Sequence, residues 1–211
     1  MKVSVSFLSK EYSQTELIKQ INKTTTNYIH VDIMDGKFTD NKTNTFSEIK
    51  KLLLNTTIPL DVHLMVNNPL KYIEDYALLN TEYITFHYEV VKDIKKTIEY
   101  IKNFGIKAGI SINPDTNVSL IFPYLKYLDL VLIMSVEPGK SGQEFKPSII
   151  YKLEALKQKI IEDNLNTKIS IDGGMNEETI PLIKDYTDII VSASYLHSGN
   201  MQDKIKEIQT L

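Results

Sequence analysis

The sequence contains no cysteine and no arginine, and these two absences limit its chemistry. Without cysteine there is no disulfide framework and no thiolate ligand, so a metal ion would have to bind histidine, carboxylate or backbone oxygen. All 24 basic residues are lysine. A phosphate group would therefore depend on backbone N–H groups and lysine, because no guanidinium group is available for a bidentate contact.

The sequence also lacks any apolar run that is long enough to cross a membrane. Residues 1–6 have neither the apolar core nor the cleavage site of a signal peptide, so we expect a cytoplasmic protein. The formal net charge of −3 and the pI of about 5.8 do not favour nucleic acid or an anionic membrane surface. We therefore expect no nucleic-acid partner and no membrane partner.

No low-complexity linker and no break in composition divides the 211 residues. With 42% hydrophobic and 24% charged residues, the chain resembles an ordinary globular protein, and we expect one domain over residues 1–211. A unit of about 25 residues recurs, in which a β-branched run precedes an amphipathic stretch. This alternation predicts βα units and a parallel sheet.

Eight strands and eight helices are predicted, which is the count of a (β/α)8 TIM barrel. The strands are expected over residues 2–7, 27–34, 59–65, 83–87, 106–112, 129–135, 168–171 and 188–192. The helices are expected over residues 14–22, 44–54, 69–79, 91–103, 117–123, 147–164, 177–184 and 202–210. A doubly wound open sheet is the alternative, and it places ligands at one switch point. Polar or glycine-rich residues follow most of the predicted strands, which favours a closed ring with all the strand ends around one site.

Three of the predicted strands end in unusual polar patterns. His30, Asp32 and Met34 alternate with apolar residues and would share one face of a strand. His63 and Met65 repeat this spacing on the next strand, and Asp172 precedes two glycines at the end of the seventh. A histidine and a carboxylate on one face of a strand are a poor basis for a core.

His30, Asp32, His63 and Asp172 therefore form a candidate set of four ligands for one divalent metal ion. The alternative is that each residue is simply a hydrogen-bonded group at a strand end. For one residue this alternative would be preferred, but four residues at corresponding positions favour the metal site. Imidazole and carboxylate ligands fit Zn, Fe, Mn or Co, and the sequence does not select one of them.

Three methionines, Met34, Met65 and Met134, end apolar strands. Methionine in a barrel usually fills gaps in the core, but the spacing from histidine predicts an apolar wall beside the ligands.

Three loops are candidates for binding a phosphate group. They follow the sixth, seventh and eighth predicted strands, where barrel enzymes commonly bind phosphate. A single glycine-rich loop is more often an ordinary turn, but three converging loops favour an anion site. The residues concerned are Gly139, Lys140, Ser141, Gly142, Gly173, Gly174, Ala193 and Ser194.

The remaining histidines leave alternatives open. His87 and Glu89 follow the fourth predicted strand, where they would either orient a ligand or lie at the rim of the site. His197 lies beyond the last predicted strand, and we interpret it as a surface residue.

Taken together, these motifs resemble one family, ribulose-phosphate 3-epimerase. The resemblance covers nearly the whole chain and rests on ordered motifs at residues 6–9, 30–36, 61–66, 85–89, 134–139 and 172–174. The sequence departs from the family pattern at Lys140, Ser141 and Ala193, where the family usually has an aromatic residue or glycine.

The resemblance implies a metal-dependent isomerase of the pentose phosphate pathway, which interconverts D-ribulose 5-phosphate and D-xylulose 5-phosphate. It implies that His30, Asp32, His63 and Asp172 bind the divalent metal and that Asp32 and Asp172 carry the protons. Ser6 and His63 would contact the substrate, the loops would hold its phosphate, and the protein would be a homo-oligomer.

In the expected reaction, one aspartate removes the C3 proton and the other donates a proton to the opposite face of a metal-stabilised enediolate. A 3-epimerase of a six-carbon ketose phosphate, such as allulose 6-phosphate, would use the same residues. A related lyase or decarboxylase would need a lysine among the strand-end groups. A non-catalytic phosphosugar-binding protein would not need two opposed carboxylates.

Overall fold

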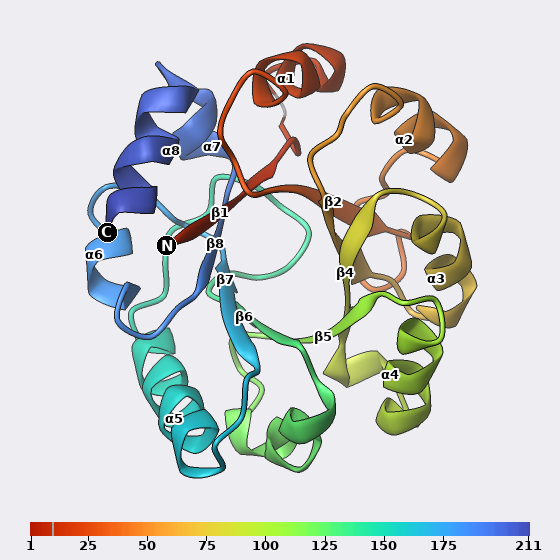
Figure 1. Ribbon diagram of the computed structural model, residues 1–211, viewed down its shortest axis with the longest axis vertical. Coiled ribbons are helices and arrows are strands. Elements are labelled where there is room, and N and C mark those ends of the chain that lie inside the picture. Colours follow the sequence, from red (N-terminus) through yellow and green to blue (C-terminus); the bar gives the residue numbers. More distant parts are fainter. Residues whose placement is uncertain (10) are drawn as a thin grey trace.

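The computed structural model describes residues 1–9 and 11–211, and in these residues eight parallel strands form a closed barrel (Figure 1). Each strand pairs with the next strand in the sequence, and β1 also pairs with β8. The strands are β1 Lys2–Ser6, β2 Tyr28–Met34, β3 Leu60–Met65, β4 Thr81–His87, β5 Lys107–Ile112, β6 Leu130–Met134, β7 Lys168–Asp172 and β8 Ile189–Ser192. The closed ring confirms the predicted barrel and rules out the open doubly wound sheet.

Helices surround the barrel on its outside (Figure 1). They are α1 Gln14–Ile21, α2 Phe46–Leu52, α3 Leu70–Ala77, α4 Ile94–Lys102, α5 Ile149–Glu162, α6 Ile180–Ile183, α7 Ser194–His197 and α8 Met201–Thr210, with 3₁₀ helices η1 Tyr88–Val90 and η2 Val118–Tyr127. The helix expected over residues 117–123 is instead the longer 3₁₀ segment η2, which contains Pro123 and therefore lacks one backbone donor. The short helices η1 and α7 were not predicted.

Local sequence explains where several helices begin. Thr45 and Glu48 form a capping box at the start of α2, each side chain accepting a hydrogen bond from the other residue's backbone. Asn200 accepts hydrogen bonds from Gln202 and Asp203 at the start of α8. These contacts satisfy N–H groups that the helix itself leaves unpaired.

The two faces of the strands differ sharply in chemistry. On β3, Val62 and Leu64 belong to the large apolar core, which also contains buried side chains of the surrounding helices. Asp61 and His63 alternate with them and are also buried. Because successive strand residues point to opposite faces, the polar pair points into the barrel. On β3 the inside of the barrel is therefore polar where most barrels carry Val, Ile or Leu.

An apolar layer closes the N-terminal end of the barrel. Tyr28, Tyr83, Leu130 and Ile189 form a separate buried cluster, and each lies near the start of an even-numbered strand. Four side chains from alternate strands are the usual content of one layer in a (β/α)8 barrel. The rings of Tyr28 and Tyr83 pack edge to face with centroids 5.7 Å apart.

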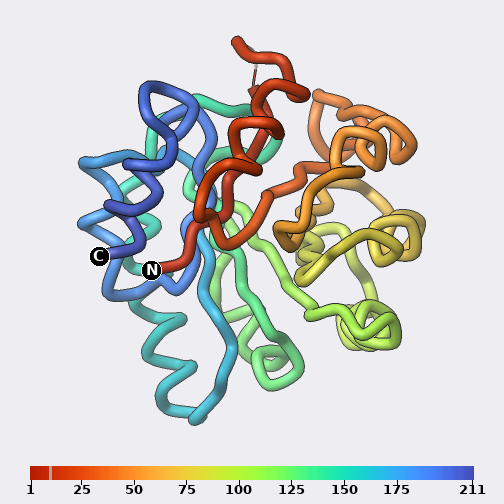
Figure 2. The backbone as a smooth tube through the Cα atoms, turned by 45° about the horizontal axis from the view of Figure 1, so that its top comes forward, coloured from red at the N-terminus to blue at the C-terminus, as the bar shows by residue number. Residues whose placement is uncertain are grey.

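The chain termini lie side by side (Figure 2). The amino group of Met1 donates a hydrogen bond of 3.2 Å to the carbonyl oxygen of Gln209 in α8. Across the part of the chain that the structure describes, no helix combines the length and the apolar character needed to cross a bilayer.

Candidate active site

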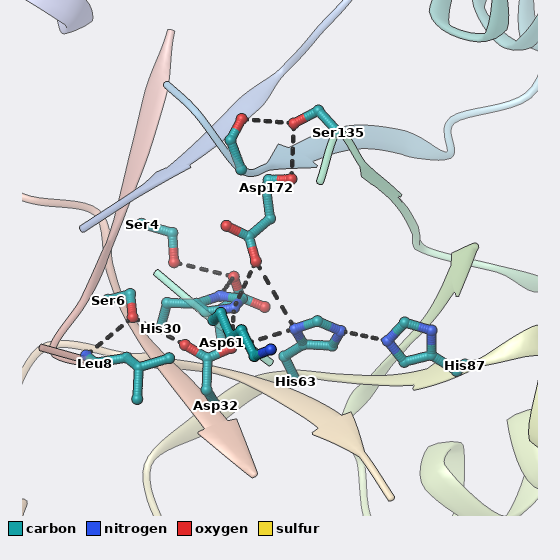
Figure 3. Close-up of polar contacts among 12 residues, drawn as sticks. Ser4, Ser6, Leu8, His30, Asp32, Asp61, His63, His87, Ser135 and Asp172 are labelled. Atoms are coloured by element: carbon teal, nitrogen blue, oxygen red, sulfur yellow. Dashed lines mark hydrogen bonds and ion pairs between the residues drawn. The ribbon is translucent and has the colours of Figure 1, made fainter. Parts of the chain in front are cut away.

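Four side chains from three strands meet at the C-terminal end of the barrel (Figure 3). His30 and Asp32 come from β2, His63 from β3 and Asp172 from β7. Each offers one nitrogen or oxygen atom, and these atoms all lie within 4.8 Å of one another. The structure thus brings together the complete set that the sequence predicted.

The spacing of these atoms fits one small divalent cation. Nε2 of His30 and Nδ1 of His63 each lie 3.3 Å from Oδ1 of Asp32 and 4.0 Å from Oδ2 of Asp172. Ligands bound at about 2.1 Å from one ion are about 3–4 Å from each other. Nε2 of His30 is also buried without a hydrogen-bond partner among the described residues. A cation at the centre would satisfy this nitrogen.

His30 is oriented by a residue that the sequence-based set did not include. Its Nδ1 lies 2.8 Å from Oδ2 of Asp61, which also accepts a 2.9 Å hydrogen bond from Oγ of Ser4. Because this contact occupies Nδ1, His30 turns Nε2 toward the cluster. Asp61 has the same strand parity as His63 and precedes it by two residues, which is the signal that would have identified it.

Asp32 and Ser6 form a second oriented pair. Ser6 lies at the end of β1, and its hydroxyl donates a 2.9 Å hydrogen bond to Oδ2 of Asp32. The same hydroxyl oxygen accepts a hydrogen bond from the backbone N–H of Leu8. Oδ2 is thereby occupied, and Oδ1 of Asp32 is left to face the two histidines.

His63 has its partner on β4. Its Nε2 lies 2.8 Å from Nε2 of His87, which is fully buried. Nδ1 of His87 lies 3.4 Å from Oε2 of Glu89 in η1. Of the two alternatives left open by the sequence, His87 therefore takes a place directly behind His63 rather than at the rim.

Asp172 is the most accessible of the four ligand candidates. Its side chain is 22% exposed, whereas that of Asp32 is 7% exposed and both histidines are fully buried. The hydroxyl of Ser135 donates to the carbonyl oxygens of Asp172 and Gly173, at 2.8 and 2.6 Å. This pair of contacts fixes the end of β7 while leaving the carboxyl group facing the pocket.

The two aspartates have opposite electrostatic environments. Burial, with the nearby carboxylates of Asp32 and Asp61, raises the pKa of Asp172 to about 7. Burial also acts against ionisation of Asp32, but the adjacent His30 and hydrogen bonds from both histidines lower its pKa well below the usual range. At neutral pH the site therefore contains one ionised carboxylate and one carboxyl group that readily holds a proton.

The two histidines also differ. Burial alone would lower the pKa of His30, but Asp32 and Asp61 raise it well above the ordinary value. Burial lowers the pKa of His63. Because a histidine ligand must be deprotonated, binding of a cation would displace the proton of His30.

A pocket opens above the cluster. Asp32 and Asp172 contribute to its wall together with Ser6. The other sequence-predicted residues that line it are Met65, Met134, Gly139, Lys140, Ser141, Gly142, Gly173, Gly174, Ala193 and Ser194. The three predicted loops thus converge on the pocket that contains both aspartates.

Met34 does not line this pocket, which corrects one part of the expected methionine wall. It lies instead in an adjoining groove with Leu8, Lys42 and Thr43. The backbone N–H of Met34 donates to the hydroxyl of Thr43, because the loop after β2 folds back along the end of that strand. The position of Met34 therefore depends on this loop, which the alternation along the strand does not describe.

Two loop glycines are required by their surroundings. Gly173 and Gly174 have φ values of 116° and 63°, which favour glycine. A Cβ atom on Gly174 would lie 2.5 Å from the backbone nitrogen of Phe145, and one on Gly173 would lie 2.4 Å from Val136. The loop after β7 therefore packs directly against the loop after β6.

His197 is buried, so its interpretation as a surface residue was wrong. It is 7% exposed, and its Nε2 lies 2.7 Å from the carbonyl oxygen of Ser6. The residue belongs to α7, a helix of four residues that was not predicted, and this helix turns the ring back toward β1. His197 thus supports the strand end that carries Ser6.

Comparison with known proteins identifies the family. The sequence pattern that describes the ribulose-phosphate 3 epimerase family matches residues 2–197. The chain belongs to the ribulose-phosphate 3-epimerase family. Among similar members named ribulose-phosphate 3-epimerase, that of Bacillus subtilis is 35% identical over 213 residues, covering 99% of this chain and 98% of the relative. That of Methanocaldococcus jannaschii is 38% identical over 196 residues, covering 92% and 83%.

Solved structures agree with the fold of this family member. N-(5'-phosphoribosyl)anthranilate isomerase from Pyrococcus furiosus superposes with a TM-score of 0.65 at 14% identity, and all of both chains is covered. A mutant tryptophan synthase α-subunit from Pyrococcus furiosus superposes with a TM-score of 0.69 at 13% identity, covering 100% of this chain and 98% of that one. At such low identity these similarities describe the barrel alone.

Proposed function

We propose that this protein interconverts D-ribulose 5-phosphate and D-xylulose 5-phosphate by inverting C3. The observation that carries the proposal is the pair Asp32 and Asp172, two carboxyl groups from β2 and β7 that line one pocket. Relatives that bear the corresponding name cover almost the whole chain. An epimerase needs one group that accepts a proton and one that donates it, and two carboxyl groups in one pocket can fill both roles.

The proton transfer is assigned to the two aspartates. The ionised carboxylate removes the C3 proton and becomes a carboxylic acid, while the electron pair of the broken C–H bond passes into a planar enediolate. The protonated aspartate then delivers its proton to the opposite face of C3, so atoms and charge balance. In the reverse direction Asp32 and Asp172 exchange roles. Each role contributes about 10²–10⁴-fold to the rate.

The residues that would hold a divalent cation are His30 through Nε2, Asp32 through Oδ1, His63 through Nδ1 and Asp172 through Oδ2. When bound, such an ion supplies Lewis-acid stabilisation of negative charge on the substrate oxygens. The ligand set suits Zn, Fe, Mn or Co.

The remaining pocket residues would bind and shield the substrate. Met65 and Met134 present surfaces without exchangeable protons, so they exclude water without competing for proton transfer. Ser6 is within reach of both Asp32 and the pocket, where its hydroxyl can contact the sugar. The loops containing Gly139, Gly173 and Ser194 would surround the phosphate, and Lys140 would add the positive charge that arginine cannot supply here.

Incubation with ribulose 5-phosphate in D₂O tests the proposal directly. We expect deuterium at C3 of both sugars by proton NMR, and we expect a chelator to suppress its incorporation. Xylulose 5-phosphate forming without deuterium at C3, or no product with cation-loaded protein, would contradict the mechanism. The ratio of kcat/KM for ribulose 5-phosphate to that for allulose 6-phosphate decides between the five-carbon and six-carbon substrates.

A further inference from the structure

A buried chain of polar groups leads from the cluster through β4 to the barrel rim. Nε2 of His63 lies 2.8 Å from Nε2 of His87 (Figure 3). Nδ1 of His87 lies 3.4 Å from Oε2 of Glu89. Neither imidazole is exposed to solvent. Glu89 is anchored by the backbone N–H of Asn113, at 2.8 Å, and by the hydroxyl of Thr116. The chain is therefore fixed at its outer end.

The contact between the two rings requires a single proton. Two N–H groups would repel each other at 2.8 Å, and so would two lone pairs, so one Nε2 donates and the other accepts. The ring planes are inclined by only 26°, which lets an N–H in one plane point along the lone pair of the other. This proton belongs either to Nε2 of His63 or to Nε2 of His87.

Glu89 assigns it. A carboxylate accepts hydrogen bonds and donates none, so it stabilises N–H on Nδ1 of His87. At 3.4 Å this contact is longer than a typical hydrogen bond, and the side chain of Asn113 also acts on His87, in the same direction as Glu89. In a neutral imidazole the second nitrogen is then an acceptor. Nε2 of His63 must therefore carry its own proton, which leaves a lone pair on Nδ1.

We propose that His87, supported by Glu89, is a positioning residue that holds His63 as the Nε2–H tautomer with Nδ1 directed at the cation ligands. The role of this tautomer in binding a cation rests on the proposed function, whereas the tautomer itself follows from the contacts of His87. Asp61 positions His30 in the same way but at the other ring nitrogen: it contacts Nδ1 and leaves Nε2 free to face the cluster. The chain thus uses two different partners to present two different ring nitrogens to one centre.

Long-range ¹H–¹⁵N correlation of histidine-labelled protein, with cations removed by a chelator, reads the tautomer directly. In the wild-type protein we expect His63 as the Nε2–H form. This measurement depends on no variant and no activity. A wild-type His63 with its proton on Nδ1 would overturn the proposal.

A matched pair of variants separates positioning from packing. His87→Gln keeps a carbonyl acceptor behind His63, and His87→Leu removes it. Thr85→Val serves as the control, because Thr85 is buried on the same strand and its hydroxyl has no partner in the described chain. With Co²⁺ as the probe, we expect His87→Leu to weaken binding by about 10–100-fold, whereas His87→Gln and Thr85→Val stay within a few-fold of the wild type.

The outcomes are distinguishable. Equal loss of Co²⁺ affinity in His87→Leu and His87→Gln, with the His63 tautomer unchanged in both, would show a packing role and overturn the proposal. The predicted tautomer together with no Co²⁺ binding in the wild type would leave the role of His87 standing and refute the proposed cation site instead.

Discussion

His30 and His63 approach the same oxygen atom with different ring nitrogens. Nε2 of His30 and Nδ1 of His63 each lie 3.3 Å from Oδ1 of Asp32. The residue behind each ring determines this difference: Asp61 behind His30 and His87 behind His63. The chemistry of the centre therefore depends on residues that never reach it.

Replacing either of the two proposed proton carriers should slow epimerisation strongly. For Asp32→Asn and Asp172→Asn we expect kcat to fall by about 10²-fold or more, because an amide neither accepts nor delivers the proton. Deuterium incorporation at C3, followed by NMR, measures the effect. Asp185→Asn, at an exposed carboxylate, is the control and should leave the rate unchanged. Turnover at the normal rate in both active-site variants would refute the assignment.

Removing the charge of Asp61 should weaken cation binding. In Asp61→Asn the amide holds Nδ1 of His30 less firmly, so we expect Co²⁺ affinity to fall by about 10–100-fold. Ser4→Ala removes only the second hydrogen bond to Asp61 and is the milder comparison. We expect it to cost about 1 kcal/mol in the free energy of unfolding and to change affinity little. Equal affinity in Asp61→Asn and wild type would show that His30 needs no support.

Gly174→Ala should displace the loop after β7. The added Cβ would lie 2.5 Å from the backbone nitrogen of Phe145, in addition to the strain at a φ of 63°. Gly199→Ala is a close control, because its φ of 73° is similar and no atom lies within 4 Å of the added Cβ. We expect both variants to lose about 1 kcal/mol or more of unfolding free energy, but only Gly174→Ala to raise KM. A rise in KM for Gly199→Ala alone would contradict this.

Lys140→Met should weaken binding of the phosphosugar without affecting proton transfer. The variant keeps most of the aliphatic stem and loses the charge at the pocket, so KM should rise by up to about fivefold while kcat stays constant. The effect should shrink as ionic strength increases, since salt screens an exposed charge. Lys157→Met, on α5, is the control. A lower kcat with unchanged KM would place Lys140 in the chemical step instead.

Asp35 should make stability depend on pH. Burial acts to raise the pKa of Asp35, but hydrogen bonds from the backbone N–H groups of Asn67, Phe38 and Lys37 lower it overall. A depressed pKa stabilises the fold above the unfolded value of about 4, and this contribution is lost as the pH falls through the lower folded value. Asp35→Asn should therefore lose about 1–3 kcal/mol at pH 7 and less at pH 3 in urea denaturation.

Asp40→Asn is the matched control for this experiment, because Asp40 is an exposed carboxylate in the same loop. Its unfolding free energy should match that of the wild type at both pH values. If Asp35→Asn were equally destabilised at pH 7 and at pH 3, the charge of Asp35 would not be the cause.

The oligomeric state stays a prediction that light scattering can measure.

The local pattern of the sequence was sufficient to predict the barrel and the four-residue cluster. Alternation along each strand determines which side chains point inward, and parallel strands around a closed ring bring their C-terminal ends to one place. The alternation along β2 and β3 and the position of Asp172 at the end of β7 therefore group His30, Asp32, His63 and Asp172 from the sequence alone. The face of a strand on which a side chain lies follows from its position in the sequence, and it does not depend on which strands pair with it.

What only the tertiary structure decided is which atoms face each other. The support of His30 by Asp61 and of His63 by His87 depends on the register between strands, which parity does not contain. The burial of His197 and the displacement of Met34 depend on a short helix and a loop that fold back from outside the strands. The sequence alone thus determined which residues gather at the site. Long-range packing decided which ring nitrogens they present, because a histidine's proton is placed by its partner.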